Sequence, residues 1–175
     1  MLGRAPIVDF DGTLARLGVD WDGLRARLGI TSLDELWTTE AGAGGGGELE
    51  GEAWRAVTEA EVAAARQAQP VDLMVSALAR CEGFAVLTGN SQAAVDAFLD
   101  RRPELGSLCL AVAGRETLRG SKRDPAAFSR GFRRCAEATQ KVRGGDALVY
   151  VGDLPWELAA ARQLGALAID VTEVR

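Results

Sequence analysis

The stretch that decides the fold is PIVDFDGTL, residues 6–14. Three apolar residues run directly into two carboxylates, Asp9 and Asp11, and a Gly-Thr turn follows. Residues two apart in an extended chain point to the same side, so both carboxylates face one place if strand pairing continues past Asp9. Two like charges this close are costly unless a cation lies between them. The pair therefore indicates a functional site, because stability alone would not select it.

The bulk composition is that of one globular domain with room for a small insertion. The chain has 175 residues, of which 47% are hydrophobic and 26% charged. Its net charge of -5 argues against a general nucleic-acid binder but allows an anionic small-molecule substrate. The early carboxylates interrupt any signal sequence, and no stretch approaches the ~18–20 apolar residues of a membrane span. We expect a cytoplasmic monomer or homodimer with no nucleic-acid or membrane partner.

The residue types limit the chemistry that the chain can perform. Histidine is absent, which excludes histidine-based triads and histidine-containing zinc sites. Three widely spaced cysteines, Cys81, Cys109 and Cys135, argue against a disulfide framework and favour reduced thiols. Acid–base chemistry must therefore come from carboxylates, lysine, tyrosine or cysteine.

Short apolar segments alternate with segments of helical periodicity. Such alternation predicts an α/β protein with an open, doubly wound parallel sheet in three layers. The predicted strands are 5–10, 84–88, 108–112, 147–151 and 166–170. The predicted helices are 16–30, with Asp20 or Asp22 as its cap and Gly29 at its end, then 31–37, 48–69, 71–80, 91–101, 125–140 and 155–164.

The interval between the first and second predicted strands is too long for a single crossover. Its roughly 60 residues contain helices and no predicted strand, so we expect a small helical insertion above the sheet. The insertion is predicted to span 15–70, and the α/β core 1–14 and 71–175. A glycine-rich run at 41–47 predicts a flexible connection within it.

Polar residues follow three of the predicted strands. They are Asp9 and Asp11 after the first, Thr88-Gly89-Asn90 after the second, and Gly152-Asp153 after the fourth. Ligands of open α/β sheets bind at the carboxyl ends of the strands. The sequence therefore predicts one site that combines these groups.

These residues carry a resemblance to the haloacid dehalogenase-like (HAD) hydrolase superfamily. The segment 8–14, VDFDGTL, resembles the first motif of that family, and Leu87-Thr88-Gly89-Asn90 resembles the second. Lys122, just before a predicted helix, resembles the third motif, and Asp153 with Glu157 resembles the acidic fourth. All four occur in the family's order across the chain. In appearance the nearest subgroup is the phosphoglycolate-phosphatase-like one, with a helical cap of the first type.

The resemblance implies a Mg²⁺-dependent phosphatase that acts on a small phosphorylated metabolite. Phosphoryl transfer needs a nucleophile, cations on the phosphoryl oxygens and a proton donor for the leaving oxygen. Asp9 would form an aspartyl-phosphate, and Asp11 would be the general acid and base. Catalysis would further use Thr88 and Lys122, the substrate phosphate would contact Thr88, Gly89, Asn90 and Lys122, and Mg²⁺ would be held by Asp9, Asp11 through its carbonyl, Asp153 and Glu157.

Two residues depart from the family pattern, and other functions compete. Glu157 stands where a second Asp is usual and is one methylene longer, so it would reach a metal through water or serve indirectly. Leu154 replaces a small polar residue. A sugar-phosphate mutase would use the same residues, and a non-catalytic phosphate-binding protein would keep only the binding groups. A dehalogenase is disfavoured because halide loss needs no proton from Asp11.

Each motif residue also has a structural interpretation. Thr88 can cap the helix that follows, and Asp153 can cap the helix that starts at Pro155. Lys122 lies in a basic segment with Arg119 and Arg123, which is typical of a solvated face. The order of the four motifs, and not any one residue, supports the site.

Overall fold

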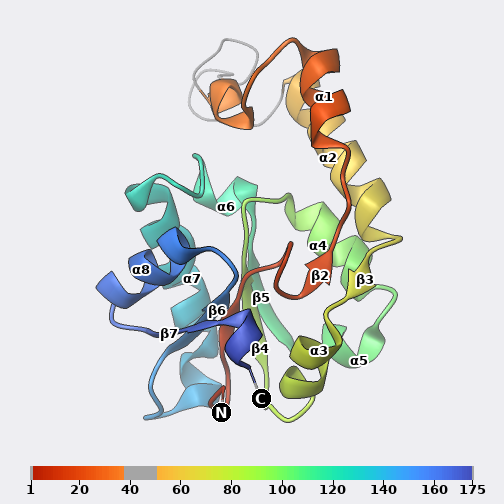
Figure 1. Ribbon diagram of the computed structural model, residues 1–175. Coiled ribbons are helices and arrows are strands. Elements are labelled where there is room, and N and C mark those ends of the chain that lie inside the picture. Colours follow the sequence, from red (N-terminus) through yellow and green to blue (C-terminus); the bar gives the residue numbers. More distant parts are fainter. Residues whose placement is uncertain (1, 38–50, 175) are drawn as a thin grey trace.

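The computed structural model describes residues 2–37 and 51–174, and its centre is a five-stranded parallel sheet (Figure 1). The strand order is β5-β4-β1-β6-β7, and each neighbouring pair is parallel. The strands are β1 (Ile7–Val8), β4 (Phe84–Leu87), β5 (Cys109–Ala113), β6 (Val149–Gly152) and β7 (Leu167–Asp170). The predicted open, doubly wound α/β sheet is confirmed, and all five predicted strands are present.

The chain winds outward from β1 in both directions. After β1 it passes to β4 and β5 on one side, and later to β6 and β7 on the other. The strand order therefore reverses beside β1, which is where open α/β sheets leave a crevice at the carboxyl ends of their strands. The stretch 6–14 lies at this position.

Helices cover both faces of the sheet, which explains why the strands are continuously apolar. Ile7 packs with α7 (Pro125–Arg143) and α8 (Pro155–Gln163) on one face of the sheet. The neighbouring Val8 packs on the opposite face with α3 (Asp72–Leu78) and α4 (Gln92–Leu99). Figure 1 shows α7 and α8 on one side of the sheet and α3, α4 and α5 (Pro103–Gly106) on the other.

Part of the segment between β1 and β4, the part that precedes α3, rises above the sheet (Figure 1). It contains β2 (Ala15–Arg16), α1 (Trp21–Leu28), the 3₁₀ helix η1 (Leu33–Trp37), α2 (Glu52–Ala65) and β3 (Gln69–Pro70). The expectation that this interval contains no strand is wrong, because β2 and β3 pair antiparallel. Strands of two residues are too short to show an alternating pattern, so the sequence did not reveal them.

The described part of this segment has an apolar cluster of its own. Leu24, Leu36, Trp54 and Val57 are buried together, separately from the two clusters that flank the sheet. The N-terminus of α1 is capped by Asp20, whose side chain accepts from Gly23 N–H, and Gly29 ends it in the left-handed conformation with φ 68°. The predicted boundaries of the insertion at 15 and 70 stay a prediction, and the glycine-rich run 41–47 lies outside the described residues.

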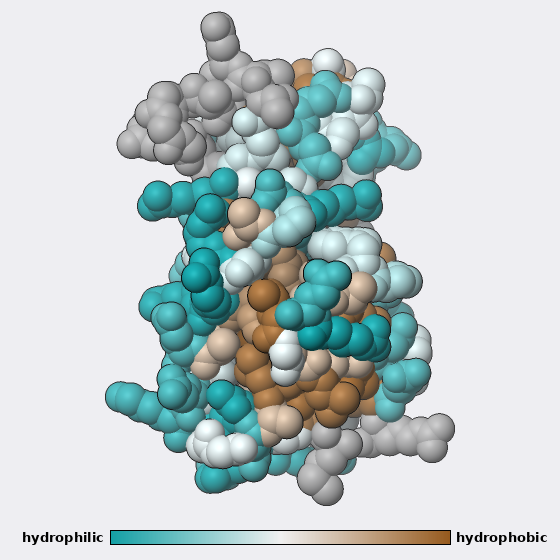
Figure 2. Space-filling view, turned by 90° about the vertical axis from the view of Figure 1, so that its left-hand side faces the viewer, coloured by the Kyte–Doolittle hydropathy of each residue, from teal (hydrophilic) through white to brown (hydrophobic). Residues whose placement is uncertain are grey.

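The remaining features of the fold are two short helices and one hydrophobic part of the surface. Two short helices, α5 and α6 (Arg115–Leu118), were not predicted, since four residues are too few to show helical periodicity. Figure 2 shows the face on the side of α8, where hydrophobic residues gather on the lower half. No helix in the described ranges 2–37 and 51–174 is both long and apolar enough to cross a membrane.

Candidate active site

Asp9 is the first residue after β1 and is buried, with 5% of its surface exposed. Its N–H donates to the carbonyl of Val151 at 2.8 Å, so pairing with β6 continues one residue past the end of β1. The side chain therefore lies at the point where the strand order reverses. The expected pairing past Asp9 is not observed among the described residues, because a turn begins at Phe10, yet Asp9 and Asp11 line the same cavity.

A tight turn after Asp9 sets the position of Asp11. The carbonyl of Phe10 accepts from the N–H groups of Leu14 and Ala15, at 2.8 and 2.9 Å. One carboxylate oxygen of Asp11 then accepts from the N–H of Leu17 at 3.0 Å, just after β2. The short strand β2, which sequence reasoning missed, thus leads into the contact that orients Asp11.

Gly12 permits the close approach of Asp153 to this turn. Its φ of 89° disfavours other residues, and a Cβ there would lie 2.3 Å from an Asp153 carboxylate oxygen. The Asp-Gly pair is therefore required by the site geometry as well as by the turn.

Lys122 lies between two carboxylates. Its ammonium nitrogen is 2.5 Å from Asp9 Oδ1 and 2.5 Å from Glu157 Oε2, and only 10% of its side chain is exposed. The interpretation of Lys122 as part of a solvated basic face is therefore excluded. A buried lysine shared by two acids leaves one negative charge in excess.

Glu157 is fully buried at the start of α8 and receives hydrogen bonds from several donors. Besides Lys122, the hydroxyl of Tyr150 donates at 2.9 Å, and the N–H groups of Asp153 and Leu154 donate at 3.2 Å each. A Cβ on Gly152 would lie 2.4 Å from its carboxylate, so this glycine makes room for it. The extra methylene of Glu157 thus lets its carboxylate extend past Gly152, at the end of β6, and contact the ammonium of Lys122.

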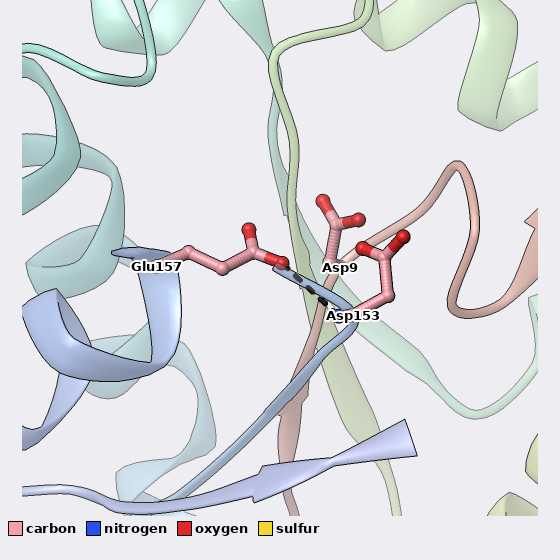
Figure 3. A group of neighbouring side chains, drawn as sticks. All are labelled: Asp9, Asp153 and Glu157. Atoms are coloured by element: carbon pink, nitrogen blue, oxygen red, sulfur yellow. Dashed lines mark hydrogen bonds between the residues drawn. The ribbon is translucent and has the colours of Figure 1, made fainter. Parts of the chain in front are cut away.

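Asp153, by contrast, has an unused oxygen. Its Oδ1 is buried and has no hydrogen-bond partner among the described residues. Asp9, Asp153 and Glu157 each place an oxygen within 4.8 Å of the others, and Figure 3 shows the three carboxylates at the ends of β1 and β6 and the start of α8. An all-oxygen, acidic group with two buried members and an orphaned oxygen on the third fits a hard divalent cation.

Burial raises the pKa of all three aspartates at the site. Desolvation is the main cause for Asp9 and raises its pKa to about 7; the charge of Lys122 opposes this rise, and the charge of Glu157 adds to it by a smaller amount. Desolvation also raises the pKa of Asp11 and of Asp153, and Glu157 raises that of Asp153 further. For Lys122, desolvation lowers the pKa, but the charges of Asp9 and Glu157 together raise it above its ordinary value.

The loop after β4 carries the predicted phosphate-contacting residues Thr88, Gly89 and Asn90, and all three line the cavity. The hydroxyl of Thr88 donates to Asn90 Oδ1 at 2.9 Å and accepts from Asn90 N–H at 3.1 Å. Ser91, and not Thr88, caps α4 by accepting from Ala94 N–H. The capping interpretation of Thr88 is therefore wrong, and its side chain holds the loop instead.

Sequence reasoning missed a second buried ion pair, Glu61 with Arg115. Both are almost fully buried, and the guanidinium forms two hydrogen bonds to the carboxylate at 3.0 Å. Glu61 also accepts from Asn90 Nδ2 at 3.0 Å and from Ser91 N–H at 2.9 Å. Helix α2 is thereby connected to the loop that carries Thr88.

The sequence did contain a signal for this pair. Glu61 occupies the buried stripe of α2 between Val57 and Ala65, at the four-residue spacing of one helix face. A charge at a core position needs a buried partner. Arg115 supplies it, and its guanidinium lies 4.5 Å from the ring centre of Trp54.

One cavity of about 390 Å³ joins these groups. Of the predicted residues, the cavity is lined by Asp9, Asp11, Thr88, Gly89, Asn90 and Lys122. Asp153 and Glu157 are not among the lining residues, but they form the acidic group with Asp9. The structure thus brings together all eight residues singled out in the sequence, from the ends of β1, β4 and β6, the loop before α7 and the start of α8.

Comparison with solved structures identifies the fold. A haloacid dehalogenase-like hydrolase from Streptococcus pneumoniae matches with a TM-score of 0.59 at 14% identity, over 95% of this chain and 83% of that one. L-2-haloacid dehalogenase from Xanthobacter autotrophicus matches at 0.57 and 16%, over 95% and 76%. A HAD hydrolase from Bacillus subtilis, solved with magnesium bound, matches at 0.54 and 12%, over 96% and 86%.

The chain therefore has the fold of the HAD-superfamily hydrolases, as its motifs predicted. No protein-family model matches the sequence, and no curated protein matches it. The phosphoglycolate-phosphatase-like subgroup and the cap type stay predictions.

Proposed function

We propose that this protein is a Mg²⁺-dependent phosphatase that hydrolyses small phosphate monoesters through a phosphoryl intermediate on Asp9. The observation that carries the proposal is the buried group at the carboxyl ends of the strands, in which Lys122 joins Asp9 to Glu157 beside the unpaired oxygen of Asp153. The segment 15–70 is proposed to be the cap that closes this site from above.

In the first step, a carboxylate oxygen of Asp9 attacks phosphorus, and the bond from phosphorus to the ester oxygen breaks. Asp11 gives its proton to the leaving oxygen. Its raised pKa favours the protonated form that this role requires, and its hydrogen bond from Leu17 orients the carboxyl. Lys122 neutralises the charge that accumulates on the phosphoryl oxygens.

In the second step, water attacks the phosphorus of the intermediate, and the bond from phosphorus to Asp9 breaks. Asp11 accepts the proton of that water, which restores both carboxyls to their starting states. Thr88, Gly89 and Asn90 are proposed to hold the phosphoryl oxygens during both steps. The hydroxyl of Thr88 then exchanges its present bond to Asn90 for one to the substrate.

The divalent cation would be held by Asp9, the carbonyl of Asp11 and Asp153. When bound, the cation would neutralise charge on the phosphoryl oxygens and so reduce the repulsion between the phosphoryl group and the carboxylate of Asp9. Glu157 is proposed to act indirectly, since its carboxylate already accepts from Lys122, Tyr150, Asp153 and Leu154. The magnesium-bound relative with this fold supports the choice of metal.

A dehalogenase is the main alternative, because relatives with this fold carry that activity. Lys122, Asp153 and the acid Asp11 favour phosphoryl transfer, since halide leaves without a proton. A sugar-phosphate mutase would use the same groups but would return the phosphoryl group to the substrate.

The test is to assay the purified protein with a panel of phosphate monoesters and with 2-chloropropionate, with Mg²⁺ or with EDTA. We expect release of inorganic phosphate that EDTA stops and Mg²⁺ restores, and no release of chloride. Chloride release would contradict the proposal and favour a dehalogenase. Conversion of a sugar phosphate to its isomer without free phosphate would contradict it and favour a mutase. Binding of phosphate esters without any turnover would favour the non-catalytic protein.

A further inference from the structure

All four tryptophans of the chain line the cavity beside Asp9. Trp21 comes from α1, Trp37 from η1, Trp54 from α2 and Trp156 from α8. Three of these elements belong to the segment above the sheet and the fourth belongs to the core. The aromatic side chains therefore reach the cavity from opposite sides.

Of the four, only Trp54 is buried; Trp21 and Trp37 pack partly against the apolar cluster around it, and Trp156 packs partly against Phe128. Trp54 is 2% exposed and is held between the ring of Trp37, at 4.7 Å between centres, and the guanidinium of Arg115. Trp21, Trp37 and Trp156 are only half-buried, although large aromatic side chains gain most from full burial. Their remaining surface contributes to the walls of a cavity that also contains the exposed side chain of Leu154.

Two of the charged groups beside the tryptophans are engaged in buried ion pairs. Arg115 is paired with Glu61, and Lys122 is paired with Asp9 and Glu157. Asp34 and Arg123 add charge to the lining, and the guanidinium of Arg123 lies 5.8 Å from the ring centre of Trp156. Away from Asp9, the lining combines four indole rings with Leu33 and Leu154 and with the polar residues Asp34, Ser121 and Arg123. The aromatic part of this lining suits a flat apolar group better than a chain of hydroxyls.

We propose that this cavity takes phosphate monoesters whose organic part is an aromatic ring. The phosphate lies at Asp9 and Lys122, and the ring lies against the faces of Trp21, Trp37 and Trp156. The cavity of about 390 Å³ is within the size range of small-molecule sites, roughly 300–1,000 Å³. This inference rests on the proposed function, because it assigns the phosphate to the same end of the cavity.

The test compares two ligands that differ only in the ring. Benzylphosphonate and cyclohexylmethylphosphonate carry the same charged group on a carbon–phosphorus bond, so neither is a hydrolysable ester. Binding is measured with Mg²⁺ by calorimetry and by tryptophan fluorescence, which reports on this cavity because every tryptophan lines it. We expect benzylphosphonate to bind about tenfold more tightly, from ring stacking on more than one indole.

Two variants assign the preference to the tryptophans. Trp156→Leu and Trp21→Leu should each reduce the preference for the aromatic ligand, and Leu73→Ala, at an exposed position on α3 that does not line the cavity, should keep it. The two substitutions lie in different elements, so a folding defect in one leaves the other informative. Equal binding of the two phosphonates, or a preference that survives both substitutions, would overturn the inference.

Phosphate release, measured separately, distinguishes this inference from the proposed function. Release of phosphate from aliphatic esters with no preference between the phosphonates would overturn the inference and leave the phosphatase intact. A tryptophan-dependent preference in a protein that releases no phosphate would support the aromatic site and remove the catalytic proposal.

Discussion

Two buried ion clusters contribute residues to the cavity wall, and they differ in charge balance. In one, Glu61 of α2 is paired with Arg115, and its carboxylate also accepts from Asn90 and Ser91. One positive charge meets one negative charge, and the ring of Trp54 lies against the guanidinium. We call this cluster complete, because its charges balance and both carboxylate oxygens of Glu61 accept hydrogen bonds.

The other cluster is incomplete. Lys122 contacts both Asp9 and Glu157, and Asp153 beside them has a buried oxygen with no partner in the described part of the chain. Desolvation is the main cause of the raised pKa of Asp9, and the charge of Glu157 adds to it. The difference teaches that burial of an ion pair does not identify a site. An unbalanced cluster with an unused oxygen does, because it is completed by a cation.

In the comparison of the two clusters, the largest combined effect on stability and activity is expected from Lys122→Met. Removal of the ammonium leaves Asp9 and Glu157 buried without it, which should lower the free energy of unfolding by about 3–5 kcal/mol at pH 8 without metal. The loss should be smaller at pH 5, where protonation of Asp9 relieves the repulsion. Phosphate release should fall by at least about a hundredfold.

Urea denaturation and a phosphate assay measure the two effects of that substitution. Lys141→Met, at an exposed position near the end of α7, is the matched control and should change neither. A Lys122→Met protein as stable and as active as the wild type would contradict the account of the unbalanced cluster.

The complete cluster should respond differently. Arg115→Met leaves Glu61 buried without its cation and should cost about 3–5 kcal/mol of stability, which Mg²⁺ does not restore. Adding Glu61→Gln should cost less than the sum of the single effects, by about 1 kcal/mol or more, because the two residues are in contact. The four proteins are compared by urea denaturation, with exposed Arg133→Met as the control. Additive effects would show that the pair is not coupled.

The two acids after β6 should contribute unequally to metal binding. Asp153→Asn should weaken Mg²⁺ binding by at least about tenfold, since it removes the charge next to the unused oxygen. Glu157→Gln should weaken it less, because that carboxylate is already surrounded by donors. Calorimetric titration with Mg²⁺ measures both, and a larger loss in Glu157→Gln would place Glu157 directly on the metal.

The smallest effect is the pH dependence of Mg²⁺ affinity. The pKa of Asp9 is raised to about 7 without metal, so its proton competes with the cation below that pH. Affinity should therefore rise as pH increases from 5.5 through 7 and change little above 8. The midpoint of thermal unfolding at several Mg²⁺ concentrations and pH values measures it. Affinity independent of pH would show that Asp9 is already ionised.

The sheet and the unbalanced cluster were predictable because both follow from local sequence. Short apolar strands with carboxylates, a Thr or an Asp at their ends predict parallel strands and a shared site, and the parallel strands are observed. Lys122 was identified by its motif alone, since its own surroundings in the sequence are basic.

The complete cluster and the aromatic walls were not predictable in the same way. Glu61 and Arg115 are 54 residues apart, and their contact depends on how α2 lies over the sheet. The strands β2 and β3 have two residues each, so no pattern marks them. Glu157 was identified as a departure from the family, but only the fold shows its long side chain turned back toward Lys122.

The central claim is that Asp9 is the nucleophile of a phosphatase. The most direct measurement compares phosphate release by the wild-type protein and by Asp9→Asn, at the same Mg²⁺ concentration and with a generic aryl phosphate. The account predicts a loss of at least about a thousandfold with an unchanged or raised unfolding midpoint, because the amide removes both the nucleophile and the excess charge. Full activity in Asp9→Asn would contradict it.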